Sequence, residues 1–128
     1  MSTIKALDLG QLPVEAINRT LNMELNAGSV KISAAAQVHA KSRHADDFGR
    51  CFPYLVQIIA NPLYVRDDFR NDGKIELVGN PVGLEEWLLV AVTISLDANG
   101  CYNVVSFYPI SEGKVIKRRE SSHLRRLI

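Results

Sequence analysis

The sequence predicts an α+β fold in which N-terminal helices pack on one face of a three- to five-stranded antiparallel β-sheet. Apolar residues recur at helical spacing in the first half, whereas the second half is rich in β-branched and aromatic residues separated by tight-turn sequences. A length of 128 residues fits a single domain spanning 1–128. We expect a helical part at about 12–62, a sheet at about 63–120 and a basic C-terminal tail at 114–128.

The first expected helix covers residues 13–25. Pro13 suits a first helical turn, and Gly28 is the expected C-cap. The apolar face of this helix would consist of Val14, Ile17, Leu21 and Leu25. A short extended piece at 29–33 should follow.

Two more helices are expected before the sheet. Ser33 is a good N-cap for an alanine-rich helix at 34–44. An aspartate at 46 or 47 would cap a third helix running to residue 60, with a kink or restart at Pro53 and its end at Pro62.

The second half predicts consecutive strands. Segments 86–96 and 101–110, joined by 97–100, are typical of a hairpin, and 74–78 should be a strand preceded by a tight turn at Asp72 and Gly73. The segment from Trp87 to Leu96 lacks clean alternation, which favours a central strand covered on both faces. Residues 114–119 are interpreted as a further edge strand, and 120–128 as a short helix or loose end.

Composition limits the function classes. The net charge is +1, so binding to nucleic acid would need an uneven distribution of charge. The two cysteines, Cys51 and Cys101, lie far apart and favour free thiols over a zinc site, with one disulfide as the alternative. We expect no metal and no cofactor. The start lacks the pattern of a signal peptide, and the longest predominantly apolar run, 87–96, is too short to span a bilayer, so a cytoplasmic location is expected.

The segment Val38–Phe48 contains two of the three histidines. His39 and His44 are five residues apart, about 140° around a helix, and so do not form a metal-binding pair. One interpretation is structural: His39 lies at the edge of the core, His44 is near the C-terminal end of the helix, and Lys41 and Arg43 lie on its solvated face. The other is half of a phosphate-handling site, in which Lys41 and Arg43 hold phosphate oxygens.

A second cationic cluster lies at 114–126, and His123 falls within it. It contains Lys114, Lys117, Arg118, Arg119, Arg125 and Arg126 against the single acid Glu120. This asymmetry suits a nucleic-acid backbone, although a solvated tail or a surface for an acidic protein would look the same. Ser106 and Tyr108, two apart, would point to the same side of a strand beside this segment.

The segment "VHAKSRH", the helix ending in "IIANP" and the strands "KIELVG", "LLVAVTI" and "YNVVSFYPI", followed by a basic end, together resemble a known superfamily. It is the barnase/EndoU/colicin/RelE-like nuclease superfamily, in its phage and polymorphic-toxin branch. The resemblance covers roughly Val30 to Leu127.

The resemblance implies metal-independent cleavage of RNA, with attack by the 2′-hydroxyl to give a 2′,3′-cyclic phosphate. By similarity, His39 and His44 are the acid–base candidates, because histidine as a residue type exchanges protons near neutral pH. Lys41 would stabilise the transition state, and Ser106 and Tyr108 would orient the phosphate. Arg43, Lys117, Arg118 and His123 would bind the RNA. The sequence alone places no glutamate where it would clearly act as the general base.

Two classes of function therefore remain open. The first is a ribonuclease toxin acting on RNA, with tRNA as one candidate, in a cytoplasm to which a larger protein could deliver it, and with a cognate immunity or antitoxin protein. The second is a non-catalytic module of the same architecture that binds nucleic acid or protein, for example in a phage. An immunity or antitoxin role for the chain itself is weaker, because such proteins often carry an acidic surface. If His39 or His44 meets Ser106, Tyr108 or His123 in one cleft, the enzyme is favoured.

Overall fold

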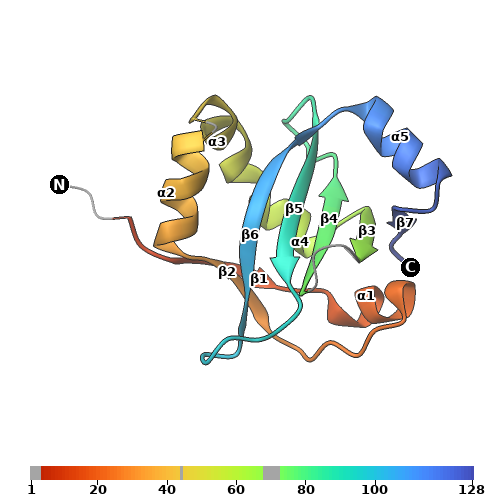
Figure 1. Ribbon diagram of the computed structural model, residues 1–128, viewed down its shortest axis with the longest axis horizontal. Helices are drawn as coiled ribbons and strands as arrows, with labels where there is room; N and C mark the ends of the chain where they lie inside the picture. The colour runs from red at the N-terminus through yellow and green to blue at the C-terminus, as the bar shows by residue number, and fades with distance from the viewer. Residues whose placement is uncertain (1–3, 44, 68–72) are drawn as a thin grey trace.

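The computed structural model describes residues 4–43, 45–67 and 73–128. Strands and helices alternate through the first part of the chain, and longer strands dominate the second (Figure 1). In chain order the elements are β1 (Leu7–Gln11), α1 (Val14–Leu21), β2 (Ser29–Ile32), α2 (Ala34–Arg43), α3 (Ala45–Cys51), the 3-10 turn η1 (Phe52–Tyr54), α4 (Leu55–Ala60), β3 (Tyr64–Asp67), β4 (Lys74–Gly79), β5 (Trp87–Thr93), β6 (Cys101–Ile110), α5 (Glu112–Glu120) and β7 (Arg125–Arg126).

The strands form one sheet in the order β1-β2-β6-β5-β4-β3-β7. Every neighbouring pair in it is antiparallel except β2 and β6. The predicted α+β class with a mainly antiparallel sheet is confirmed. The sheet has seven strands in the described part of the chain, more than the three to five expected, because short strands extend both of its edges.

The two faces of the sheet carry different layers. The first face holds the main core, where α1, α3 and α4 pack against Ile75, Val90 and Phe107. The second face holds a smaller core at one end, where α5 contributes Val115, and Leu124 from the turn after it packs beside Val78 and Leu89. The same face also carries Glu76 and Ser106, beyond this smaller core.

Several local predictions are confirmed. The side chain of Ser33 accepts a hydrogen bond from the Ala36 N–H at the start of α2, as an N-cap does. Pro53 lies in the 3-10 turn between α3 and α4, where a kink was expected. The core of β5, from Leu88 to Val92, is buried throughout, as expected for a central strand. Both cysteines are free.

The first helix is shorter than predicted. It ends at Leu21, and Asn22 serves as the C-cap in the left-handed region at φ 56°, a conformation that asparagine tolerates. The amide of Asn18 then bonds both the N–H and the carbonyl of Leu25. These bonds hold the chain in a turn, so Gly28 is not the cap.

The predicted edge strand at 114–119 is wrong, because this segment is the middle of α5. Ser111 is the N-cap, and its hydroxyl accepts a hydrogen bond from the Lys114 N–H. The predicted tight turn before β4 involves Asp72, which lies outside the described residues. No helix within the described ranges is both long and apolar enough to cross a bilayer.

Candidate active site

A row of three polar side chains and one alanine crosses the second face of the sheet. The register pairs Arg66 with Glu76, Glu76 with Ala91, and Ala91 with Ser106. Residues directly opposite one another in antiparallel strands point to the same face, so these four form one row, here called the polar row. The next row toward α5 runs through Tyr64, Val78, Leu89 and Tyr108.

Glu76 is the buried carboxylate of the polar row. It is 7% exposed, and its Oε1 lies 3.1 Å from Nη1 of Arg66. Burying a carboxylate is costly unless a charge and hydrogen bonds compensate it, and Arg66 supplies both. The sheet therefore holds one carboxylate in a fixed position on the face that also carries Ser106.

An inserted residue in β6 sets the direction of Ser106. Ala91 pairs with Ser106, whereas its neighbour Val92 pairs with Val104, so Val105 is the extra residue of a β-bulge. Strict alternation would have put Ser106 on the same side as Val104, in the main core. The bulge instead sends Phe107 to the core and places Ser106 and Tyr108 on the second face.

Helix α2 lies beside the edge of β6 that β2 leaves unpaired. β2 pairs with β6 only along Cys101–Asn103. The chain then turns at Ser33 into α2, where the buried amide of Gln37 donates to the carbonyls of Lys5 and Ile32. These bonds fix the helix against the sheet and so set the positions of its side chains.

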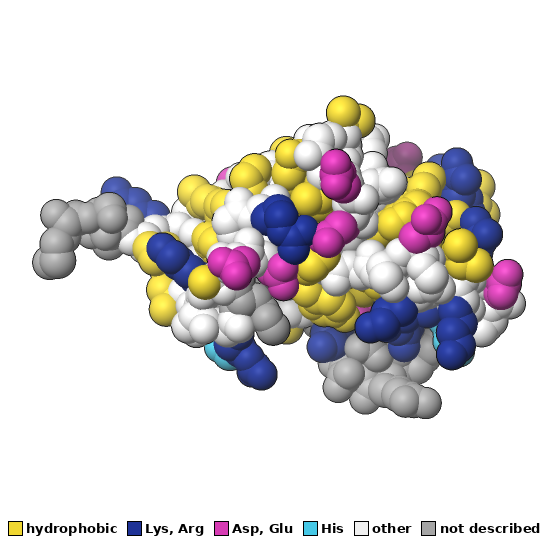
Figure 2. Space-filling model, turned by 90° about the horizontal axis from the view of Figure 1, so that it is seen from above, with side chains coloured by type: hydrophobic (Ala, Val, Ile, Leu, Met, Phe, Trp, Pro, Cys, Tyr) yellow, Lys and Arg dark blue, Asp and Glu magenta, His cyan; other side chains and the backbone are white. Residues whose placement is uncertain are grey.

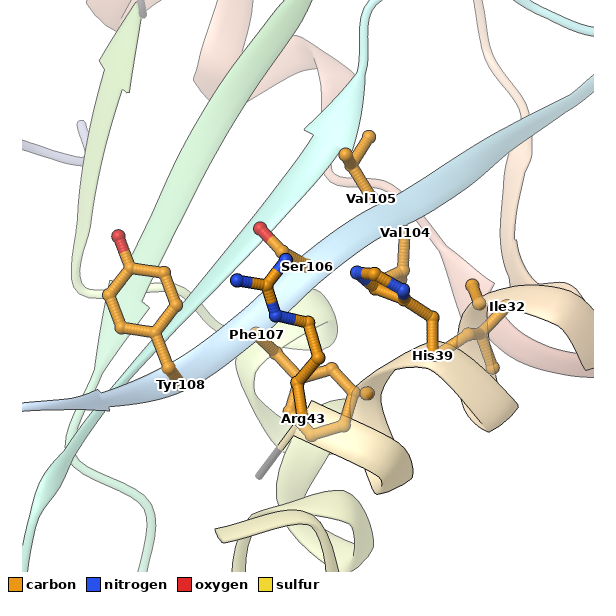
Figure 3. Close-up of a pocket in the computed structure, with 10 residues that line it drawn as sticks. Ile32, His39, Arg43, Val104, Val105, Ser106, Phe107 and Tyr108 are labelled. Atoms are coloured by element: carbon orange, nitrogen blue, oxygen red, sulfur yellow. The ribbon is translucent and has the colours of Figure 1, made fainter. Parts of the chain in front are cut away.

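A pocket of about 170 Å³ lies between α2 and β6. Its polar residues are His39 and Arg43 from α2 and Ser106 and Tyr108 from β6. Figure 3 shows the side chains of His39 and Arg43 extending over β6, with the guanidinium of Arg43 beside Ser106. The remaining lining is apolar and comprises Ile32, Ala36, Ala40, Val104, Val105 and Phe107.

Arg118 approaches this face from α5. Its Nη1 is buried and has no hydrogen-bond partner among the residues that the structure describes. Burial raises the pKa of the Tyr108 hydroxyl and the charge of Glu76 adds to this effect, whereas Arg118 opposes it. Tyr108 is therefore a hydrogen-bond donor at neutral pH, with the cationic Arg118 beside it.

The structure brings together part of the predicted site. His39, Arg43, Ser106 and Tyr108 line one pocket, and Arg118 lies close enough to Tyr108 to affect its titration. Three other predicted residues, Lys41, Lys117 and His123, are exposed and do not line that pocket. His44 lies outside the described residues.

No metal centre is evident in the described chain. No three His, Cys, Asp or Glu side chains within 4–43, 45–67 and 73–128 gather closely enough to hold an ion. The polar atoms of the site belong to imidazole, guanidinium, hydroxyl and one paired carboxylate, which are the groups that bind and protonate phosphate esters.

The sequence interpretation missed Glu76 and Arg66. A signal was present, because Glu76 is the one charged residue between Ile75 and Leu77 in a strand that is otherwise apolar after Lys74. A charged residue inside such a strand must be paired, which marks it for attention. Its proximity to the row of Ser106 depends on the order of the strands, which the local sequence does not encode.

An α+β sheet that presents a histidine, arginines and a paired carboxylate beside a basic helix has the composition of a nuclease site. Comparison with protein families agrees, because residues 9–117 match the phage-Barnase-EndoU-ColicinE5/D-RelE like nuclease family 3. The chain belongs to this family, and the resemblance found in the sequence is confirmed. No curated protein and no solved structure matches the chain significantly.

Proposed function

We propose that the protein is a metal-independent endoribonuclease that cleaves RNA by attack of a 2′-hydroxyl on the adjacent phosphate. One observation carries the proposal: His39, Arg43, Ser106 and Tyr108, which come from two elements far apart in sequence, line a single pocket. Ser106, which lines this pocket, belongs to the polar row that also contains Glu76. Family membership supports nuclease chemistry, and the choice of RNA and of this mechanism is ours.

The reaction needs two proton transfers on opposite sides of the phosphorus. Glu76 on β4 and His39 on α2 lie on opposite sides of Ser106, so a phosphate bound near Ser106 would have one group on each side. We assign the carboxylate of Glu76 as the base. It takes the proton of the 2′-hydroxyl as the bond from O2′ to phosphorus forms. Protonated His39 gives its proton to the 5′-oxygen as the bond from phosphorus to O5′ breaks.

His44 is the second acid–base candidate from the sequence and stays in the proposal as the alternative to Glu76. Substituting each residue separately distinguishes the two, because only the true partner of His39 would show a loss as large as that of His39 itself. With either base, the step ends with the base protonated and His39 deprotonated. Proton exchange with water then returns both groups to their starting states before the next turnover.

Cations and hydroxyls would stabilise the charge that develops on the phosphate. Arg43 lies in the pocket, and Arg118 has a buried N–H without a partner in the described chain. Both suit the oxygens of a pentacoordinate phosphorus, which carry more charge than those of the substrate. Ser106 and Tyr108 would orient the phosphate through their hydroxyls. Lys41, which is exposed on α2, would stabilise the charge on the phosphate from the solvent side of the site.

The rest of the RNA strand would follow α5. Lys117, Arg118 and Arg119 form the last turn of this helix, and His123 follows it. Figure 2 shows Lys and Arg side chains grouped at the end of the molecule where α5 and β7 lie. We propose this surface as the site for the RNA backbone. The target would be tRNA or another RNA in a cytoplasm, and a toxin of this type would have a cognate inhibitor protein.

Incubating the purified protein with total RNA in EDTA tests the proposal. We expect discrete fragments from the wild type and a loss of about 10²- to 10⁴-fold in rate for His39→Ala, the range for removal of an acid–base group. Val38→Ala, at an exposed neighbour on the same helix that does not line the pocket, is the matched control. Intact RNA with folded wild-type protein would instead support the non-catalytic binding module.

A further inference from the structure

The pocket between α2 and β6 is more apolar than a phosphate site needs to be. Six of the ten lining residues that the structure describes are aliphatic or aromatic, and three of them, Ile32, Val104 and Phe107, are buried. A phosphate would use His39, Arg43, Ser106 and Tyr108 and would gain nothing from contact with Val104 or Phe107. The apolar lining therefore indicates a ligand with a flat or apolar surface that adjoins a phosphate.

We propose that this pocket binds one unpaired nucleobase of the RNA, next to the phosphate that is cleaved. This inference rests on the proposed function and deepens it, because it assigns a specificity site to that enzyme. A nucleobase joins an apolar face to a polar edge, and its own sugar-phosphate places a charge a few bonds away. The pocket has the same combination, because the apolar Val104 and the cationic Arg43 both line it.

The walls suit stacking. Ala36 and Ala40 lie one turn apart on α2, and their small side chains leave the space between helix and strand open. His39 and Arg43, one turn apart in the same way, carry planar groups over β6 (Figure 3). Imidazole and guanidinium planes are two of the surfaces on which proteins stack unpaired bases.

The strand edge suits recognition of the polar edge of the base. β6 loses its partner β2 after Asn103, so alternate N–H and C=O groups of the following residues point away from β5, where no strand of the described chain pairs with them. Val104, Val105 and Ser106 of this edge line the pocket. Main-chain donors and acceptors in fixed positions can distinguish one base from another. A base inside a duplex is stacked and cannot enter, so the ligand is a single strand or a loop.

Filling the pocket tests the inference on the enzyme. Ala40→Leu adds bulk to the helix wall, and Val38→Leu makes a comparable change at a position 51% exposed that does not line the pocket. The substrate is an RNA oligonucleotide with one mapped cleavage site, compared with versions that have an abasic ribose on either side of that site.

For the wild type, we expect removal of one of the two flanking bases to lower kcat/KM by about 5- to 150-fold, the range for loss of a stacked base. Ala40→Leu should lose a similar factor on the intact RNA and nothing further on the abasic substrate, while Val38→Leu should match the wild type. Ala40→Leu with wild-type kcat/KM on intact RNA would overturn the inference, as would an equal loss on all substrates.

A binding measurement separates this inference from the proposed activity. Nucleoside 5′-monophosphates and ribose 5-phosphate are titrated into the protein while the methyl NMR signals of Ile32, Val104 and Val105 are followed. We expect saturable shifts with the nucleotides, none with the sugar phosphate, and none in Ala40→Leu. Shifts without RNA cleavage would retain the base site and refute the enzyme. Cleavage without shifts or any abasic effect would refute the base site alone.

Discussion

Replacing Glu76 by glutamine separates its proposed chemical role from its structural one. The carboxylate is 7% exposed and bonded to Arg66 at 3.1 Å. Glutamine has the same size and keeps an oxygen that can accept the same hydrogen bond, so packing is preserved and the negative charge is lost. The variant can no longer accept the proton of a 2′-hydroxyl.

The two consequences differ in magnitude. Removing one partner of a buried ion pair costs about 3 to 5 kcal/mol. Glutamine keeps the hydrogen bond and Arg66 is partly exposed, so we expect the unfolding free energy to fall by a smaller amount, about 1 to 3 kcal/mol. Loss of a general base lowers the rate by about 10²- to 10⁴-fold, which corresponds to about 3 to 5 kcal/mol in the barrier. The effect on the rate should therefore exceed the effect on stability.

The assay combines kcat/KM on an RNA oligonucleotide with urea unfolding of the same preparations. Glu24→Gln, at an exposed glutamate between α1 and β2, is the matched control and should leave both quantities unchanged. A Glu76→Gln protein with wild-type kcat/KM would refute the assignment of Glu76 as the base. If kcat/KM fell only in proportion to the fraction of unfolded protein, Glu76 would have a structural role instead.

Three further predictions follow from single positions. Gly83→Ala should destabilise the protein in urea by about 1 kcal/mol more than Gly10→Ala, because both have positive φ (98° and 100°) but only the Cβ at Gly83 would meet a neighbour, Tyr54 Oη at 2.8 Å; equal losses would contradict the steric argument. Hydrogen bonds, first from Lys31 and then from its other partners, lower the pKa of Asp97 in the folded protein. The ionised carboxylate therefore stabilises the fold above the unfolded pKa of about 4, and this stabilisation is lost as the pH falls below that value. The difference in urea midpoint between the wild type and Asp97→Asn should accordingly narrow in acid, and a constant difference would count against it. Lys117→Ala should weaken RNA binding at all sequences alike and reduce the slope of log K against log salt by about one, whereas an unchanged slope would place this lysine away from the RNA.

Local signals were sufficient for much of the fold. The hydroxyl of Ser33, the ring of Pro53 and the β-branched residues of β5 act within a few residues, and each produced the element that the sequence predicted. β1 was missed for the opposite reason. Its five residues are mostly exposed and weakly patterned, and it is a strand because β2 provides its hydrogen bonds.

The helix α5 shows the limit of a pattern. Apolar Val115 and Ile116 among Lys and Arg are compatible with both a strand and a helix. The deciding features are the cap at Ser111 and the burial of Val115 beside Leu124, which is a tertiary contact. Misassignment of this element hid the position of Arg118 on the second face of the sheet.

The site was predictable in its residue types and only partly in its geometry. The distance along the chain between His39 and Ser106 gives no indication that they share a pocket, and the family resemblance supplied that expectation. Glu76 joins the row of Ser106 only because β5 lies between β4 and β6, with Ala91 opposite both. The strand order is a property of the whole sheet.

The most direct test of the central claim uses one atom of the substrate. An RNA oligonucleotide with a single cleavage site is compared, in EDTA, with the same molecule carrying 2′-deoxyribose at the nucleotide that supplies the attacking hydroxyl. Our account predicts a 2′,3′-cyclic phosphate on the fragment from the all-RNA substrate and no cleavage of the 2′-deoxy substrate at that site. Cleavage of both substrates at the same site and rate would contradict it, because the nucleophile would then come from elsewhere.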